Sequence, residues 1–201
     1  MFKSIGIVPL TQSYFAAIGG NTPNGSMQSL DVVRRAVVDL GSVGFQVTAV
    51  SALYQTPAYP AGSGADFINA AVAFDSRKSP DEVLAIFHDI ERLRGRQRQE
   101  RWGPRTLDLD LLAQGARVLP DRATWRHWWA IPAAEQRDST PDRLVLPHPR
   151  LQDRGFVLIP LRDIAPAWRH PVLERSVAEM CADLPACEVE SVLKLADPPC
   201  V

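Results

Sequence analysis

Several features are scarce or absent in this chain of 201 residues, and each absence excludes a class of protein. The 22 lysines and arginines are balanced by 23 aspartates and glutamates, which gives a net charge of −1. We therefore expect no nucleic-acid or membrane-surface partner, because such binders carry a basic excess. No apolar run approaches the roughly 20 residues that cross a membrane. The three cysteines, Cys181, Cys187 and Cys200, lack partners at metal-binding spacing, and we interpret them as reduced thiols of a cytoplasmic protein.

A phosphate-binding glycine loop is also missing. Gly19 and Gly20 form a turn after an apolar stretch, but their spacing matches neither a P-loop nor a dinucleotide fingerprint. The remaining composition, 46% hydrophobic and 22% charged, is typical of a globular chain with a substantial core. We predict a single domain over residues 1–201, with an N-terminal extension at 1–13 and an inserted excursion at 121–142.

The spacing of apolar residues predicts an α+β fold. We expect strands at 14–18, 45–54, 67–74 and 107–111, helices from Ser26 to Gly41 and from Ser79 to Gly95, and a mobile loop at 55–66. This order, strand-helix-strand-strand-helix-strand, is that of a ferredoxin-like βαββαβ sheet with helices packed on one face. Additional C-terminal elements follow: short strand segments at 116–119 and 144–149, helices at 155–164 and 173–184, and an edge strand within 188–195.

The second helix has the clearest start. Ser79 can cap it, Pro80 suits its first turn, and two acidic residues follow near the positive end of its dipole. Its buried side is expected to comprise Val83, Phe87, Ile90 and Leu93.

The segment 121–142 has no clean period and contains Trp125, Trp128 and Trp129. We interpret it as an excursion packed on the surface. A partner-binding aromatic patch is the alternative that the sequence leaves open.

The stretch RWGPRTLDLDLL at 101–112 is the most informative. Leucines alternate with Asp108 and Asp110, so the leucines face a core and both aspartates face the opposite side. Residues two apart on one strand face have Cα atoms roughly 6–7 Å apart, and two carboxylates at that spacing can share divalent ions. Mg²⁺ takes one or two protein carboxylates and completes its octahedron with water and substrate phosphates.

Six arginines, Arg92, Arg94, Arg96, Arg98, Arg101 and Arg105, lie just upstream of the acidic pair. Taken separately, an Asp-x-Asp pair can be a solvated strand face and an arginine cluster can be a solvated helix end. Together, joined by the Gly103-Pro104 turn, they favour a site for a metal-bound polyphosphate, which needs cations for its oxygens and carboxylates for its metal. Asn69, a polar residue in an apolar strand, can be a structural amide or a ligand contact, and the sequence alone favours the structural role slightly.

Longer motifs resemble a known family. The matching segments are AAIGGN at 16–21, LYQTP at 53–57, FINAAV at 67–72, IERLRGRQR at 90–98, RWGPRTLDLDLL at 101–112 and LPHPRLQDRGFVLIPL at 146–161. They resemble the 6-hydroxymethyl-7,8-dihydropterin pyrophosphokinases of folate synthesis. The resemblance implies transfer of diphosphate from ATP to the hydroxymethyl group of a reduced pterin, with release of AMP and with two Mg²⁺ ions on the triphosphate.

The resemblance also implies roles for individual residues. Asp108 and Asp110 would hold the metals, and Arg96 and Arg105 would be catalytic. The nucleotide would be bound by His88, Glu91, Arg98, Arg101, Trp102, Leu111, Arg143, His148 and Arg154. The pterin would be bound by Thr56, Pro57, Tyr59, Phe67, Asn69, Trp102 and Phe156. The loop at 55–66 and the arginine loop would act as lids that exclude water.

The chain departs from the family pattern in places. The arginine loop is one residue shorter and lacks a common lysine, a tyrosine is often found where Phe67 stands, and the short members have no counterpart of 121–142. Two other hypotheses compete with the resemblance: another Mg²⁺-dependent transferase that uses Asp-x-Asp, and a catalytically silent ferredoxin-like binding module. We expect a monomer with ATP and the pterin as its small-molecule partners.

Overall fold

The computed structural model describes residues 11–22, 27–58, 64–96, 105–132, 135 and 139–199. Its strands are β1 (Gln12–Gly20), β2 (Gln46–Val50), β3 (Leu53–Thr56), β4 (Phe67–Ser76), β5 (Asp108–Gln114) and β6 (Leu193–Ala196). Its helices are α1 (Ser29–Ser42), α2 (Pro80–Leu93), α3 (Arg122–Ala130), α4 (Gly155–Ile164), α5 (Val177–Ala182) and α6 (Ala186–Glu190), with a 3₁₀ turn at Leu151–Asp153. Over these residues, we find no helix with the length and apolar character needed to cross a membrane.

The strands form one antiparallel sheet in the order β5-β1-β4-β3-β6, and β2 also pairs with β4. The predicted strand at 45–54 is therefore two strands, which pair with successive parts of β4. The chain bends at Ser51, whose Oγ accepts a hydrogen bond from the Ala71 amide at 2.8 Å and donates one to the Ala52 carbonyl at 2.7 Å. With β2 and β3 counted as one bent strand, the βαββαβ order of a ferredoxin-like sheet is confirmed.

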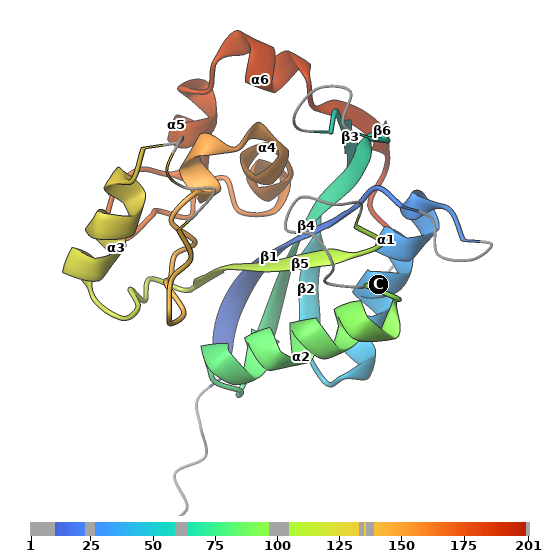
Figure 1. Cartoon of the computed structure of the whole chain (residues 1–201), viewed down its shortest axis with the longest axis horizontal. Helices are drawn as coiled ribbons and strands as arrows, with labels where there is room; N and C mark the ends of the chain where they lie inside the picture. The colour runs from blue at the N-terminus through green and yellow to red at the C-terminus, as the bar shows by residue number, and fades with distance from the viewer. Residues whose placement is uncertain are drawn as a thin grey trace, which may run out of the picture.

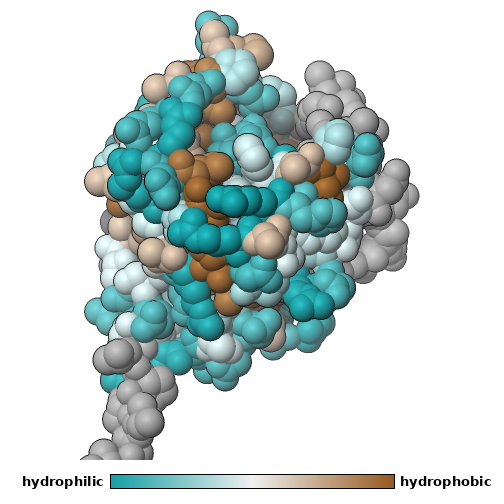
Figure 2. Space-filling view, turned by 90° about the vertical axis from the view of Figure 1, so that its left-hand side faces the viewer, coloured by the Kyte–Doolittle hydropathy of each residue, from teal (hydrophilic) through white to brown (hydrophobic). Residues whose placement is uncertain are grey.

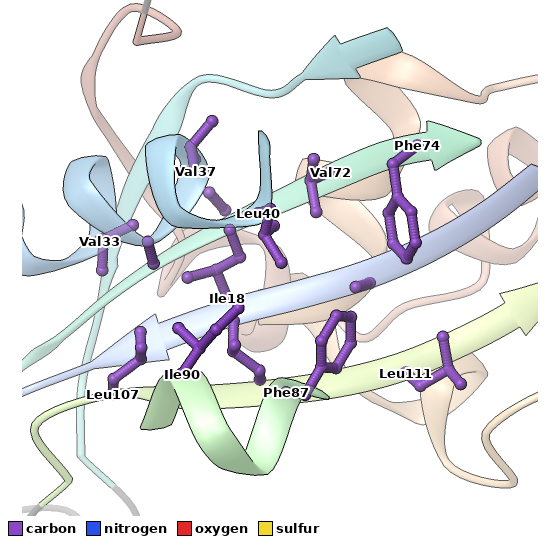
Figure 3. Packing of buried hydrophobic residues seen from close by; sticks show 14 of the residues in the cluster. Ile18, Val33, Val37, Leu40, Val72, Phe74, Phe87, Ile90, Leu107 and Leu111 are labelled. Carbon is purple, nitrogen blue, oxygen red and sulfur yellow. The ribbon is translucent and has the colours of Figure 1, made fainter. Parts of the chain in front are cut away.

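Helices cover both faces of this sheet rather than one (Figure 1). On the first face, α1 and α2 pack their apolar stripes against β1, β4 and β5 to form the larger core (Figure 3). On the opposite face, α4 and α5 pack over Ala71 of β4 and Leu112 of β5. The two helices of the ferredoxin-like unit, α1 and α2, thus share one face as expected, and the additional C-terminal elements return across the other.

The start of α2 was predicted correctly, and one residue of its buried stripe was not. Ser79 caps the helix in a reciprocal hydrogen-bonded arrangement with Glu82. Leu93 is 73% exposed. At the end of the helix Arg94 points inward instead, and its guanidinium makes two hydrogen bonds of 2.6 Å to Asp39 of α1.

The boundaries of α1 also differ from the prediction. The helix begins at Ser29 with Gln28 as its N-cap, and Ser26 lies outside the described residues. Gly41 belongs to the helix, Val43 is its C-cap, and Gly44 takes the left-handed turn with a φ of +90°.

The C-terminal half contains the largest differences. The predicted strand segments at 116–119 and 144–149 reduce to one bridge between Leu119 and Leu146, with hydrogen bonds of 2.8 and 3.0 Å. The first part of the excursion is the regular helix α3, in which Trp125 alone is buried, so its sequence shows no apolar stripe. The helix expected at 173–184 is shortened to α5, and the tail forms α6 before the edge strand β6.

Candidate active site

The alternation in β5 is confirmed, and it places the two carboxylates on one face of the sheet. Leu107, Leu109 and Leu111 are buried in the core under α1 and α2. Asp108 and Asp110 therefore point to the opposite face, where they stand beside Gly19 and Ala17 of β1 in the strand register. Both carboxylates are half-buried, so they remain partly accessible on this face.

One row of the sheet connects Asp108 to Asn69. Gly19 pairs with Asp108 on β5 and with Asn69 on β4, and paired residues present their side chains on the same face. A Cβ atom on Gly19 would lie 2.8 Å from the Asn69 Oδ1 atom, so the amide leans over this glycine. The Asn69 Nδ2 atom donates a hydrogen bond of 2.8 Å to Thr56 Oγ1, which orients the amide. Asn69 is thus held by β3 with its oxygen directed over β1.

Two arginines from separate segments hold Asp108. Arg96 Nη1 donates to Asp108 Oδ1 at 2.5 Å, and Arg105 Nη1 donates to the other carboxylate oxygen. The same Arg96 nitrogen donates to Glu91 Oε1 of α2, which also accepts a hydrogen bond of 2.8 Å from the Leu109 amide. Because Glu91 is only 2% exposed, it fixes the end of α2 against the edge of β5.

The local charges change the protonation equilibria of these groups. Burial raises the pKa of Asp108, the neighbouring charge of Asp110 raises it further, and Arg105 and Arg96 oppose the shift. Burial acts to lower the pKa of Arg96, but the carboxylates of Asp108 and Glu91 outweigh it and the pKa is raised. Arg96 is therefore a permanent cation, and the two guanidinium groups oppose the raised pKa of Asp108 without reversing it.

The turn before α4 contributes a second cluster. Burial, followed by the charges of Arg154 and Arg150, lowers the pKa of His148 to about 3, so the imidazole is neutral near pH 7. Burial lowers the pKa of Arg154, and the negative charges of Asp110 and Asp108 oppose this shift without overcoming it. Arg154 also lies over the ring of Phe156, 5.7 Å from its centroid.

Asn21 is a site residue that the sequence reasoning missed. Its backbone N–H donates to the Arg105 carbonyl and its Oδ1 accepts from the Arg105 amide, both at 2.9 Å. Its Nδ2 donates to the Ala65 carbonyl at 3.0 Å, just after the segment 59–63. The asparagine that ends the Gly-Gly-Asn turn therefore fixes the backbone of Arg105, and only the strand pairing reveals this role.

The remaining residues predicted to bind the nucleotide or the pterin lie in several different places. A cavity of about 250 Å³ is lined by His88, Glu91, Arg92 and Arg96. The Leu111 side chain faces the core, so only its backbone, on the same strand edge as the Leu109 amide, could contact a ligand.

Arg143 is exposed and bonds to its neighbour Asp142, so its contacts do not join it to the cluster. Thr56 and Phe67 are paired beside Asn69, and Pro57 is exposed directly after β3. Arg98, Arg101, Trp102 and Tyr59 lie outside the described residues.

The acidic pair fits a magnesium ion. Asp108 and Asp110 lie two residues apart on one face of β5, where Cα atoms are roughly 6–7 Å apart, so their carboxylates can share a cation. No cluster of three or more His, Cys, Asp or Glu ligands occurs in the described part of the chain. Magnesium at this pair would therefore take its remaining ligands from water and from a bound phosphate.

A ferredoxin-like sheet with paired carboxylates and converging arginines on the face opposite α1 and α2 defines a candidate metal- and polyphosphate-binding protein. The family model "7,8-dihydro-6-hydroxymethylpterin-pyrophosphokinase (HPPK)" matches residues 15–166. The chain therefore belongs to this family.

Individual relatives agree with this assignment. A protein of Synechocystis sp. named 2-amino-4-hydroxy-6-hydroxymethyldihydropteridine pyrophosphokinase is 37% identical over 152 residues, covering 75% of this chain and 67% of its own. A Pseudomonas aeruginosa protein of the same name is 33% identical over 189 residues, covering 92% of this chain and 98% of its own. A Plasmodium falciparum HPPK-DHPS crystal structure is 13% identical with a TM-score of 0.63, covers 90% of this chain, and supports the fold alone. This chain spans about half of that structure's length, 47%.

Proposed function

We propose that this chain transfers diphosphate from ATP to the hydroxymethyl group of 6-hydroxymethyl-7,8-dihydropterin and releases AMP. Family membership supports the reaction class. The observation that carries the proposal is the row Asp108, Gly19, Asn69 across β5, β1 and β4. Two strand spacings separate its outer residues by roughly 10 Å, so a polyphosphate at Asp108 and a flat polar ring at Asn69 would be neighbours.

In this reaction the hydroxyl oxygen bonds to the β-phosphorus as the bond from that phosphorus to the α,β-bridging oxygen breaks. AMP leaves with the bridging oxygen, and the hydroxyl proton is released. Arg96 and Arg105 can exchange Asp108 for the phosphate oxygens and stabilise the charge that develops there. Asp108 and Asp110 would hold two magnesium ions, which when bound neutralise and orient the triphosphate.

The pterin is flat, aromatic on its faces and polar at its edges. Asn69 offers an amide already oriented by Thr56, and Phe67 and Phe156 offer aromatic surface from β4 and α4. These residues could bind the ring edge by hydrogen bonds and its face by stacking. The closeness of Arg154 to both Phe156 and the carboxylate pair supports a single site for both substrates.

The test is AMP release from ATP with magnesium, in the presence and absence of the hydroxymethylpterin. We expect AMP only with the pterin, and a loss of about a thousandfold or more in Asp108→Ala and Asp110→Ala. Asp31→Ala, which removes an exposed carboxylate of α1, is the matched control and should retain full activity.

Thermal unfolding should show all three variants folded, because none of these side chains lies in the core. Rates like those of the unmodified chain in either site variant would refute the metal role. Pterin-independent turnover would indicate another transferase, and no turnover at all would indicate a silent binding module.

We also expect the enzyme to act as a monomer in the cytoplasm. Cys181 and Cys187 are both free thiols, one buried and one exposed, which suits a reducing compartment. Light scattering on purified protein measures the mass of the species in solution, and a mass twice that of the chain would contradict the monomer.

A further inference from the structure

Helix α3 contacts the chain at the residues that flank His148. The Trp125 side chain is fully buried, and its Nε1–H donates a hydrogen bond of 2.7 Å to the carbonyl of Pro147, the residue before His148. The ring of Trp129 stacks on Trp125 with centroids 6.1 Å apart. The helix thus holds the 147–150 turn from one side by a hydrogen bond and by aromatic packing.

Arg150 holds the same turn from the other end of the helix. Its guanidinium donates to the Ile131 carbonyl at 2.5 Å and to the Trp129 carbonyl at 3.4 Å, at the C-terminal end of α3. Asp121 caps the N-terminus by accepting from the Thr124 amide at 2.8 Å. Both ends of this nine-residue helix are therefore satisfied, and one of the two caps comes from the turn.

These contacts fix the orientation of the His148 ring. The Arg150 amide donates to His148 Nδ1 at 3.1 Å, and the His148 amide donates to the Leu112 carbonyl of β5 at 2.7 Å. Because Nδ1 of the neutral ring is an acceptor, its hydrogen is on Nε2. The turn therefore presents a single N–H donor, on a residue that the hydrogen bond to Leu112 holds beside β5.

The outer surface of α3 gives less support to a docking role. Figure 2 shows the side of the molecule that carries α3, where apolar residues are separated by hydrophilic ones instead of forming one continuous patch. The most apolar contact of the helix is directed inward, through Trp125. The observations therefore favour a role inside this molecule.

We propose that α3 is a positioning element for the nucleotide site, in which Trp125 and Arg150 hold the 147–150 turn so that His148 presents its Nε2–H donor to the ATP. This inference rests on the proposed function, because it assumes that His148 contacts the nucleotide. Trp125 and Arg150 are positioning residues that act through His148.

The experiment measures the affinity for a non-hydrolysable ATP analogue with Mg²⁺ by calorimetry, with kcat measured in parallel. Trp125→Phe removes the donor to Pro147 and keeps an aromatic ring, and Arg150→Met removes both donors to the α3 carbonyls. We expect each to raise the Kd of the analogue about fivefold, the effect of one ordinary hydrogen bond, with kcat at saturating ATP within about twofold.

Two control variants separate this role from general packing. Trp129→Phe makes the same chemical change in a partly exposed ring of the same helix and should leave the Kd within about twofold. Asp153→Asn removes the ion pair of Arg150 at 3.0 Å but leaves its bonds to the carbonyls, and it should also bind like the unmodified chain.

The decisive comparison repeats both changes in a His148→Ala background. If Trp125 and Arg150 act through His148, their effects on the Kd disappear there, whereas a merely structural role would add the same loss in both backgrounds. Unchanged affinity in both single variants, or fully additive losses, would overturn the inference alone. If Trp125→Phe fails to fold by circular dichroism, Arg150→Met decides the result. Absence of analogue binding by the unmodified chain would overturn the proposed function and this inference with it.

Discussion

At the β5 end of the site, Asp108 is held by two opposite charges, Arg96 and Arg105. In the turn before α4, His148 is neutral and is held by backbone hydrogen bonds, while Arg150 and Arg154 stand beside it as cations. The first region pairs a carboxylate with two cations, whereas the ring at the centre of the second is uncharged and Arg150 pairs outward with Asp153. Because of this difference, we expect loss of a charge to lower mainly kcat in the first region and mainly nucleotide affinity in the second.

The largest effect on kcat is expected at the β5 end of the site, where Arg96 and Arg105 pair with Asp108. Arg105→Ala removes a group that can stabilise charge at the transferred phosphate, and kcat should fall about a thousandfold while the Kd of the ATP analogue changes less than tenfold. Arg34→Ala, which removes an exposed arginine of α1 paired with Asp31, is the control. A change in KM with unaltered kcat would show that Arg105 binds the ground state only.

A buried neutral histidine, His170, packs against α3, and its protonation at low pH should destabilise the fold. His170 is fully buried against Trp125, with ring centroids 4.8 Å apart, and its Nδ1 accepts from the Val172 and Leu173 amides. Burial lowers the pKa of His170 to about 4, below its ordinary value of 6.5.

The unfolded chain therefore binds this proton first. Stability from the neutral ring is complete above pH 6.5 and is lost as the pH falls toward 4, by about 3 kcal/mol in all. Denaturant unfolding as a function of pH measures the loss. His170→Asn, which keeps an acceptor near the Nδ1 position, should remove the share of this loss that belongs to His170 and leave the share of His148, whose pKa is also lowered, to about 3. An unchanged profile would contradict the assignment to His170.

In the turn before α4, loss of one cation should have a smaller effect, on nucleotide affinity rather than on kcat. Arg154→Met keeps an apolar chain over Phe156 and removes a cation near both carboxylates. The Kd of the ATP analogue should rise about tenfold, and kcat at saturation should change less, because the lost contact is with bound nucleotide in both states. Calorimetry beside steady-state kinetics separates the two. A loss confined to kcat would contradict this and would assign Arg154 the role proposed for Arg105, stabilisation of the transition state.

Local patterns were enough to predict the elements whose signals are periodic. The alternation around Asp108 and the Ser79 cap depend on residues a few positions apart, so the sequence displays them directly. The sequence did not display the orientation of Asn69, because Thr56 reaches it only through the β3–β4 register. The sequence pattern alone therefore could not predict that the Asn69 amide is oriented for a ligand.

The α3 region was predicted least well for a physical reason. A helix that buries one side chain, Trp125, has no stripe to detect, and its C-terminal cap comes from Arg150, 19 residues beyond Ile131. Leu93 was misplaced in a similar way, since the neighbouring charged residue, Arg94, turns inward and is half-buried by pairing with Asp39. Side-chain pairing across distant segments decided these positions.

The most direct test of the account is a crystal structure with magnesium, a non-hydrolysable ATP analogue and the pterin. We predict that Asp108 and Asp110 each have an oxygen about 2.1 Å from magnesium. Arg96 and Arg105 should then contact phosphate oxygens, with the pterin edge bonded to Asn69. Metal and phosphates bound elsewhere, with Asp108 still paired to both arginines, would contradict the account.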